Sequence, residues 1–174
     1  MEHLKLFENF NKKTISDFPY VMEFYKKFNK DVGGIPIYII SEEDWVDGKS
    51  RATENDNKGG IRIHEDQVKI DSNIGWLIHE VGHVLDIRGE RMPYLISRED
   101  FDGYPNEDNE QTPMWYQFEY LISKGLTEDE VLNLLKESYE NSKGEGSTWN
   151  QPPGYKDKFF RAYYKKMKQL KTLK

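Results

Sequence analysis

The chain has 174 residues, none of them cysteine, and 25 basic residues against 31 acidic ones give it a net charge of −6. This length predicts one domain with a sizeable hydrophobic core, and the acidic balance argues against nucleic acid as a partner. The absence of cysteine excludes disulfides and thiolate ligands, so any bound metal must be held by histidine and carboxylate side chains.

The N-terminal part of the chain is expected to contain one helix and several short strands. Apolar residues at helical spacing predict a helix over residues 17–30, and the β-branched segment 35–40 predicts a buried strand. Residues 41–58 are polar and lack a sustained period, which indicates a long surface loop that could hold one short strand. Apolar and polar residues then alternate on both sides of His64-Glu65-Asp66, the pattern of a hairpin over residues 59–71.

The following part is expected to be mainly helical. Ser72 or Asn73 is expected to cap a helix that runs to about residue 88. An irregular segment rich in proline, glycine, aspartate and asparagine comes next, and a further helix is predicted over about residues 114–124. Residues 127–130 form a capping box that predicts another helix start.

A basic amphipathic helix is predicted over residues 156–174 at the end of the chain. The order of elements, with strands first and helices afterwards, predicts a single α+β domain over residues 1–174. Its expected parts are one small mixed sheet, a helix carrying the histidines described next, and a mostly helical C-terminal part.

Two of the four histidines lie four residues apart in "IGWLIHEVGHVLDIRG", and a glutamate directly follows the first. On a helix His79 and His83 share one face, so both imidazoles can point at one cation. Glu80 is rotated by about 100° from His79, outside the ligand pair but within reach of a water at the cation. The alternative is a core helix whose two histidines bond to backbone carbonyls.

Two other residues of this helix bear on the same interpretation. Gly82 would permit a neighbouring element to approach closely at the level of the histidines. Asp86 lies on the face of His79 and His83, where a carboxylate can accept the outer N–H of a ligating imidazole. A solvated or salt-bridged role for Asp86 is the alternative.

A catalytic zinc usually has three protein ligands and an open position, so a third ligand is expected downstream. The histidines His3, in a terminal segment, and His64, on the expected hairpin, are poorly placed. We favour Glu110, with Glu107 and Glu119 as alternatives, because Glu110 begins an apolar stripe. The stripe continues through Met114, Phe118 and Leu121.

Pro113 constrains the helix that follows this ligand. A helix that started at Asn109 would lose a backbone hydrogen bond at Pro113. Either the helix starts nearer Thr112, with Glu110 just ahead of it, or its first turn is distorted.

The residues "HEVGHVLD" with a downstream glutamate resemble the zincin metallopeptidases of the short gluzincin type. One similar branch is the anthrax-lethal-factor-like group with the Pro-Pro endopeptidases, in which the helix reads H-E-x-x-H-x-x-D and a tyrosine precedes the glutamate ligand. Tyr104 stands six residues ahead of Glu110 here. The other branch is the minigluzincins, whose short separation of motif and glutamate resembles the 26 residues between His83 and Glu110.

The resemblance covers about residues 35–125, which are the expected catalytic core. It implies a zincin-like fold and a peptidase in which one Zn²⁺ is held by His79, His83 and Glu110. Glu80 would take a proton from the attacking water and pass it to the leaving amine, and Tyr104 would help to stabilise the oxyanion. An ordinary loop or core role is the alternative for Tyr104.

The same resemblance implies that residues 59–63 form a rim strand beside an extended substrate, with an ordinary sheet edge as the alternative. The expected partner is therefore a peptide or protein, bound by a monomer that contacts neither nucleic acid nor membrane. Because the first residues lack an apolar run and a cleavage site, we expect a cytoplasmic location.

A different class of function remains open from the sequence. The chain could be a binding or regulatory module with zinc as a structural clamp, or a latent form whose cleft is covered by its own tail. The C-terminal helix raises this alternative because its wide aromatic side must bury against something, either the core or the cleft. That side consists of Phe159, Phe160, Tyr163, Tyr164 and Met167.

Overall fold

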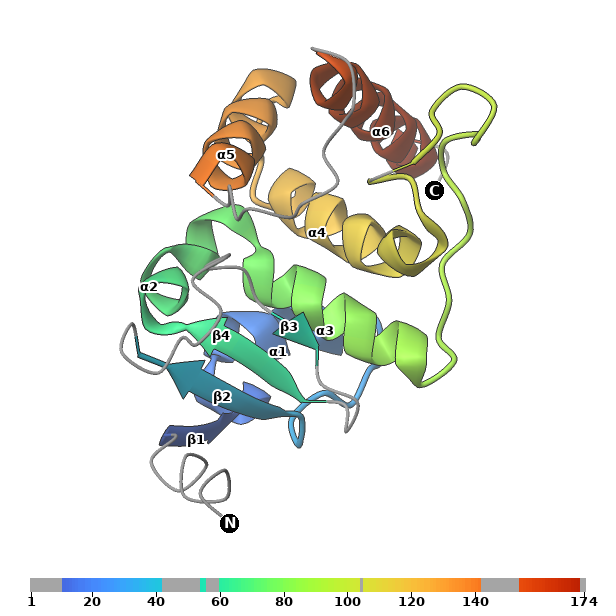
Figure 1. The fold of residues 1–174 in the computed structure, drawn as a ribbon. Coiled ribbons are helices and arrows are strands. Elements are labelled where there is room, and N and C mark those ends of the chain that lie inside the picture. The colour runs from blue at the N-terminus through green and yellow to red at the C-terminus, as the bar shows by residue number, and fades with distance from the viewer. Residues whose placement is uncertain (1–10, 42–53, 56–59, 104, 142–153, 173–174) are drawn as a thin grey trace.

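A small mixed sheet lies at one end of the structure, and helices make up most of the remainder (Figure 1). The computed structural model describes residues 11–41, 54–55, 60–103, 105–141 and 154–172. The predicted α+β class is confirmed. Among the described residues, no helix combines the length and the apolar character that crossing a membrane requires.

The sheet has four strands in the order β1-β2-β4-β3: β1 (Asn11–Thr14), β2 (Pro36–Ile40), β4 (Ile61–His64) and β3 (Glu54–Asn55). The central strands β2 and β4 are parallel, and the outer strands pair with them antiparallel. Ile37 of β2 and Ile61 and Ile63 of β4 are fully buried. The strand predicted over residues 35–40 is confirmed. The expectation that residues 59–63 form the rim is wrong, because β3 lies outside β4.

The hairpin predicted around His64 is also wrong. β4 ends at His64, and α2 (Glu65–Ile74) begins at the next residue. The backbone N–H of Asp66 donates to Nδ1 of His64 at 3.2 Å, which stabilises the turn from strand to helix. The acidic residues Glu65 and Asp66 suit the first turn of a helix because they face its positive end. The segment after His64 is too short for its alternation to distinguish a strand from a helix.

The histidine-bearing helix is α3 (Trp76–Ile87), which starts later than the sequence suggests. Ser72 and Asn73 lie inside α2, and the break falls at Gly75, whose φ is +71°. A left-handed residue at this point redirects the chain between the two helices. A Cβ at Gly75 would also lie 2.9 Å from Cδ1 of Tyr120. Glycine is therefore required here both by the left-handed backbone and by the lack of space for a side chain.

The N-terminal helix α1 (Pro19–Lys26) is shorter than predicted at both ends, and the 3₁₀ turn η1 (Ile15–Asp17) precedes it. Tyr25 of α1 is buried, and its hydroxyl donates to the carbonyl oxygen of Ile78 at 2.7 Å. This hydrogen bond links α1 to α3. Burial raises the pKa of Tyr25, so the phenol stays protonated and can donate.

Three helices form the C-terminal part: α4 (Gln111–Ser123), α5 (Glu128–Asn141) and α6 (Tyr155–Thr172). The 3₁₀ turn η2 (Asp108–Glu110) precedes α4. The capping box predicted before α5 is confirmed, because the Glu130 carboxylate accepts from the backbone N–H of Thr127 at 2.8 Å. In return the Thr127 hydroxyl accepts from the Glu130 N–H at 3.4 Å.

The aromatic side of α6 is part of the core. Phe159, Phe160 and Tyr163 are buried, and the Tyr163 ring lies 4.8 Å from the ring of Phe118 on α4, centroid to centroid. Figure 1 shows α4 between α3 and α6. The described part of the C-terminal helix therefore completes the core against α4, on the side of α4 away from α3. Most of the loop before it lies outside the described residues.

A candidate metal centre between two helices

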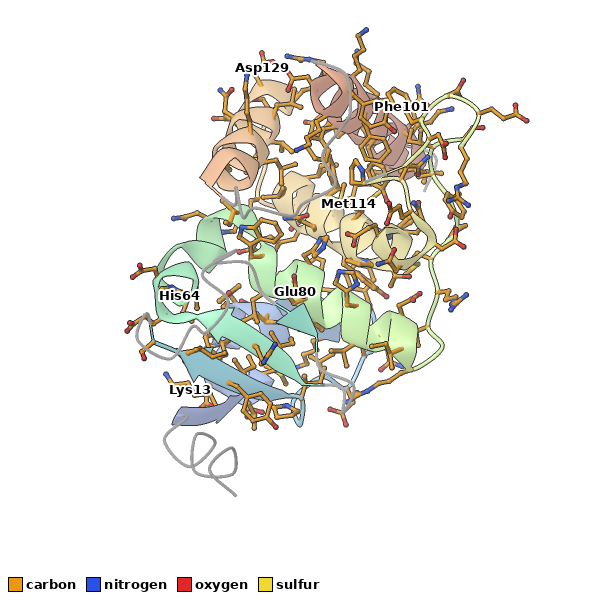
Figure 2. The ribbon with its side chains drawn as sticks, in the orientation of Figure 1. Lys13, His64, Glu80, Phe101, Met114 and Asp129 are labelled. Atoms are coloured by element: carbon orange, nitrogen blue, oxygen red, sulfur yellow. The ribbon has the colours of Figure 1, made fainter. Side chains whose placement is uncertain are left out.

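The sequence of α3 makes it a buried helix with one polar side. All residues from Trp76 to Leu85 are buried except His83, which is partly exposed. The apolar side chains pack into the core, and the histidines face the start of α4. Figure 2 labels Glu80 on α3 and Met114 on α4, the helix that packs along it. The site is thus formed where two helices far apart in the sequence meet.

Glu110 lies opposite both histidines. Nε2 of His79 is 3.3 Å from one carboxylate oxygen of Glu110, and Nε2 of His83 is 3.7 Å from the other. One ligand atom from each of these residues lies within 4.8 Å of the others. Two ligand atoms about 2.1 Å from a tetrahedral zinc ion are roughly 3.4 Å apart, close to the two nitrogen–oxygen distances of 3.3 and 3.7 Å. The residues expected to bind metal are brought together.

The burial of Glu110 gives an independent test of whether the site fits a cation. Its side chain is 9% exposed, and the side chain of His79 is 3% exposed. Oε2 of Glu110 is buried and receives no hydrogen bond from the described residues. A buried carboxylate oxygen is costly unless a positive charge lies beside it, and either the protonated ring of His79, 3.3 Å away, or a cation between Oε2 and that ring would offset the cost. The donor set of two imidazoles and one carboxylate is one that zinc accepts.

The pKa values of the three groups are strongly linked. Burial lowers the pKa of His79, but the combined effect of Glu110, Glu80 and the hydrogen bond to Gln117 outweighs burial, so this pKa lies above its ordinary value. Burial and the charge of His79 lower the pKa of His83 to about 4. Burial raises the pKa of Glu110, but the hydrogen bond and charge of the protonated His79 ring, with a smaller contribution from His83, outweigh burial and lower this pKa. At about pH 6 the protein alone therefore holds an ionised Glu110, a neutral His83 and a His79 ring that is protonated on both nitrogens.

Glu80 is separate from the convergent group, as its position on the helix predicts. It is 4% exposed, and its charge contributes to the raised pKa of His79. In the part of the chain that the structure describes, the convergent group consists of His79, His83 and Glu110, without Glu80. Glu80 is thus a buried carboxylate on the helix of the two histidines, outside the convergent group.

The other residues considered from the sequence do not join the group. Glu119 forms an ion pair with Lys171 at 3.0 Å, and neither it nor Glu107 belongs to the convergent set. Tyr104 and His3 lie outside the described residues, so the role expected for Tyr104 stays a prediction.

Asp86 has a different partner from the one expected. Its Oδ1 accepts a hydrogen bond from the Thr112 hydroxyl at 3.1 Å and lies 3.5 Å from Nε of Arg91. The Thr112 hydroxyl in turn accepts from the backbone N–H of Met92 at 2.9 Å. The expectation that Asp86 accepts a hydrogen bond from an imidazole is therefore wrong. Asp86 links the end of α3 to the start of α4. His83 instead forms a hydrogen bond with the backbone of Asn109.

Gly82 allows α3 and α4 to touch through their backbones. A Cβ on Gly82 would lie 2.5 Å from Cα of Pro113, closer than such atoms approach in proteins. The close approach expected at this glycine is confirmed. α4 begins at Gln111 with Glu110 just ahead of it, so Pro113 falls in the first turn, where its missing N–H is not needed. Of the two helix starts considered, the first is correct.

We expect Gly82→Ala to destabilise the protein, although alanine normally favours a helix. The added methyl group meets the backbone of Pro113, which cannot rotate away, so the free energy of unfolding should fall by about 1–3 kcal/mol. Denaturant unfolding measures this change. The matched control is Gly34→Ala, where no atom lies within 4 Å of the added Cβ and a change within about 0.5 kcal/mol is expected. A Gly82→Ala protein as stable as the wild type would contradict the close backbone contact.

Sequence reasoning missed two buried polar residues beside the site. Oε1 of Gln117 lies 3.1 Å from Nδ1 of His79. The side chain of Asn106 donates to the carbonyl of Phe101 at 2.7 Å and accepts from Nε2 of Gln111 at 2.9 Å, which shapes the loop that leads to Glu110. A signal for Gln117 was present, because it is a polar residue two helical turns beyond Glu110 on an otherwise apolar face.

A scan against protein-family models, a search of curated proteins and a search of solved structures each found no match.

Proposed function

We propose that this protein is a zinc-dependent peptidase of the zincin type. The observation that carries the proposal is the convergence of Glu110 on the two histidines of the H-E-x-x-H helix, with Glu80 buried beside them but outside the ligand group. The spacing of two histidines on a helix predicts a ligand pair. The third candidate ligand, Glu110, comes from a separate part of the chain just ahead of α4 and lies at distances that suit zinc. A helix that only contributes to the core would not require this convergence.

His79, His83 and Glu110 would hold the metal. When bound, zinc lowers the pKa of a water ligand to about 7 and polarises the carbonyl group of a peptide. Glu80 accepts a proton from the attacking water and delivers it to the leaving amine, a role that requires a carboxylate near the ligands but not among them. The surrounding apolar residues of α3 exclude bulk water, which strengthens these charge interactions.

An extended peptide is the substrate class that this architecture favours. β3 (Glu54–Asn55) forms one edge of the described sheet and contacts α3. Backbone groups at a sheet edge can pair with an added strand, which would align a peptide along the helix that carries Glu80. In this proposal the strand beside the peptide is β3, and not the segment 59–63 that was expected from the sequence.

The alternative is a protein that uses zinc only as a structural clamp, or a latent form of the enzyme. Structural zinc sites usually have four protein ligands, whereas the group found in the described part of the chain has three. This difference favours catalysis. The test is the zinc content of the purified protein together with cleavage of a peptide library. Bound zinc without any cleavage would favour the clamp or latent form, and no bound zinc would refute both.

We expect zinc binding to release about one proton at about pH 6. The raised pKa of His79 means that its ring carries a proton there, and zinc can bind only after this proton leaves. His83, with a pKa of about 4, is already neutral, and Glu110 is already ionised. Zinc affinity should therefore rise with pH until the pH exceeds the pKa of His79.

Calorimetric titration in buffers of different ionisation enthalpy measures the number of protons released. At about pH 6 a water on zinc keeps its protons, since its pKa is about 7, so the released proton reports on the ligands. Release of two protons would show that His83 also titrates in this range, against its lowered pKa. Release of none would contradict the raised pKa of His79.

A further inference from the structure

The amide of Gln117 connects His79 to the end of α2. Gln117 lies on α4, is fully buried, and is seven residues beyond Glu110. Its Nε2 donates to the backbone carbonyl of Ile74 at 3.1 Å, and its Oε1 lies 3.1 Å from Nδ1 of His79. Both contacts are buried, so neither side of the amide can exchange its partner for water.

The carbonyl of Ile74 fixes the direction of both contacts. A backbone carbonyl can only accept a hydrogen bond, so the amide group that faces it must be the NH₂ group. The amide oxygen must then face His79, and because this oxygen can also only accept, Nδ1 of His79 has to carry a proton. An amide turned by half a rotation would set two acceptors against each other at Ile74, which is costly in a buried position.

The protonation of Nδ1 determines what His79 presents on its other side. In a neutral imidazole with a proton on Nδ1, Nε2 has none, and Nε2 is the atom that lies 3.3 Å from Glu110. We infer that Gln117 is a positioning residue for the metal centre, an inference that rests on the proposed zinc site. It holds His79 in the tautomer and ring orientation that direct the Nε2 lone pair at the cation.

A neutral amide is the side chain that satisfies both neighbours of Gln117. A carboxylate could accept from His79, but its second oxygen would face the Ile74 carbonyl without a proton between them. An apolar side chain would leave Ile74 without this donor and His79 without its acceptor. These two failures can be separated experimentally, because glutamate loses one contact and leucine loses both.

The experiment compares Gln117→Leu, Gln117→Glu and the neighbouring Phe118→Leu for zinc affinity and for the tautomer of His79. Phe118 packs against Phe160 and Tyr163 of α6, so its truncation disturbs α4 without touching His79. We expect Gln117→Leu to weaken zinc binding by about 10–100-fold, the usual effect of removing the partner of a histidine ligand. Gln117→Glu and Phe118→Leu should lose stability but keep zinc affinity within a few fold.

The tautomer is read from the ¹⁵N chemical shifts of His79 in the metal-free protein at alkaline pH. The wild-type ring should carry its proton on Nδ1, and the Gln117→Leu ring should lose this preference. A wild-type proton on Nε2, or unchanged zinc affinity in a folded Gln117→Leu protein, overturns the inference. If Gln117→Leu does not fold, the wild-type tautomer decides. A wild-type protein with the expected tautomer that binds no zinc supports the hydrogen-bond assignment and refutes the proposed function.

Discussion

Glu80→Gln should fold and bind zinc like the wild type while losing peptide hydrolysis by about 10²–10⁴-fold. Glu80 is buried beside His79 but outside the ligand group, so an amide of the same size preserves packing and leaves the three ligands in place. The amide cannot accept the proton of the attacking water, so the catalytic step is lost selectively. Zinc content, unfolding midpoint and cleavage rate, measured on one preparation, separate these effects.

The matched control for this variant is Glu119→Gln, which makes the same chemical change on α4. Glu119 pairs with Lys171 at 3.0 Å, so the control should lose only one partly exposed ion pair and keep full activity. Cleavage at the wild-type rate by Glu80→Gln would show that another group acts as the base. Loss of zinc from Glu80→Gln would instead place Glu80 among the ligands.

Alanine replacement of His79, His83 or Glu110 should abolish zinc retention after dialysis. Each removes one of three ligands, a larger loss than the roughly 10–100-fold that follows removal of an outer partner. Saturating zinc should therefore raise the unfolding midpoint of the wild type and leave that of each variant unchanged, since only a form that binds zinc is stabilised by it. Elemental analysis and thermal unfolding with and without zinc measure both effects.

Glu119→Ala serves as the negative control and should keep full zinc content, because its carboxylate contacts Lys171 away from the site. Circular dichroism of each variant without zinc shows whether lost metal reflects a missing ligand or an unfolded chain. Full zinc content in Glu110→Ala would remove Glu110 from the ligand set and direct attention to Glu107.

The convergent group could be predicted from the sequence because each member follows from local periodicity. The four-residue spacing of His79 and His83 sets their common face, and the apolar stripe behind Glu110 points that carboxylate towards the core. The same reasoning failed at His64. Its short flanking segments suit a strand and a helix equally, and in the structure a hydrogen bond from the Asp66 N–H to the His64 ring stabilises the turn into the helix.

Partners from distant parts of the chain could not be predicted. Periodicity correctly placed Asp86 near the histidine face, but the approach of Thr112 gives its carboxylate a different donor. The role of Gln117 depends on the carbonyl of Ile74, which accepts its hydrogen bond. This carbonyl is available because the chain breaks at Gly75, between α2 and α3. Local sequence thus identifies the proposed metal ligands more readily than the residues that would orient them.

The contact of Gly82 with Pro113 bears on how this protein can change during evolution. Where two helices are separated by interlocking side chains, substitutions in the core shift the helices and everything they carry. At Gly82 no side chain intervenes, so the separation of α3 from α4 is set by backbone atoms. A change of side-chain volume elsewhere in the core should then move the histidines relative to Glu110 less than it would between two helices that meet only through side chains.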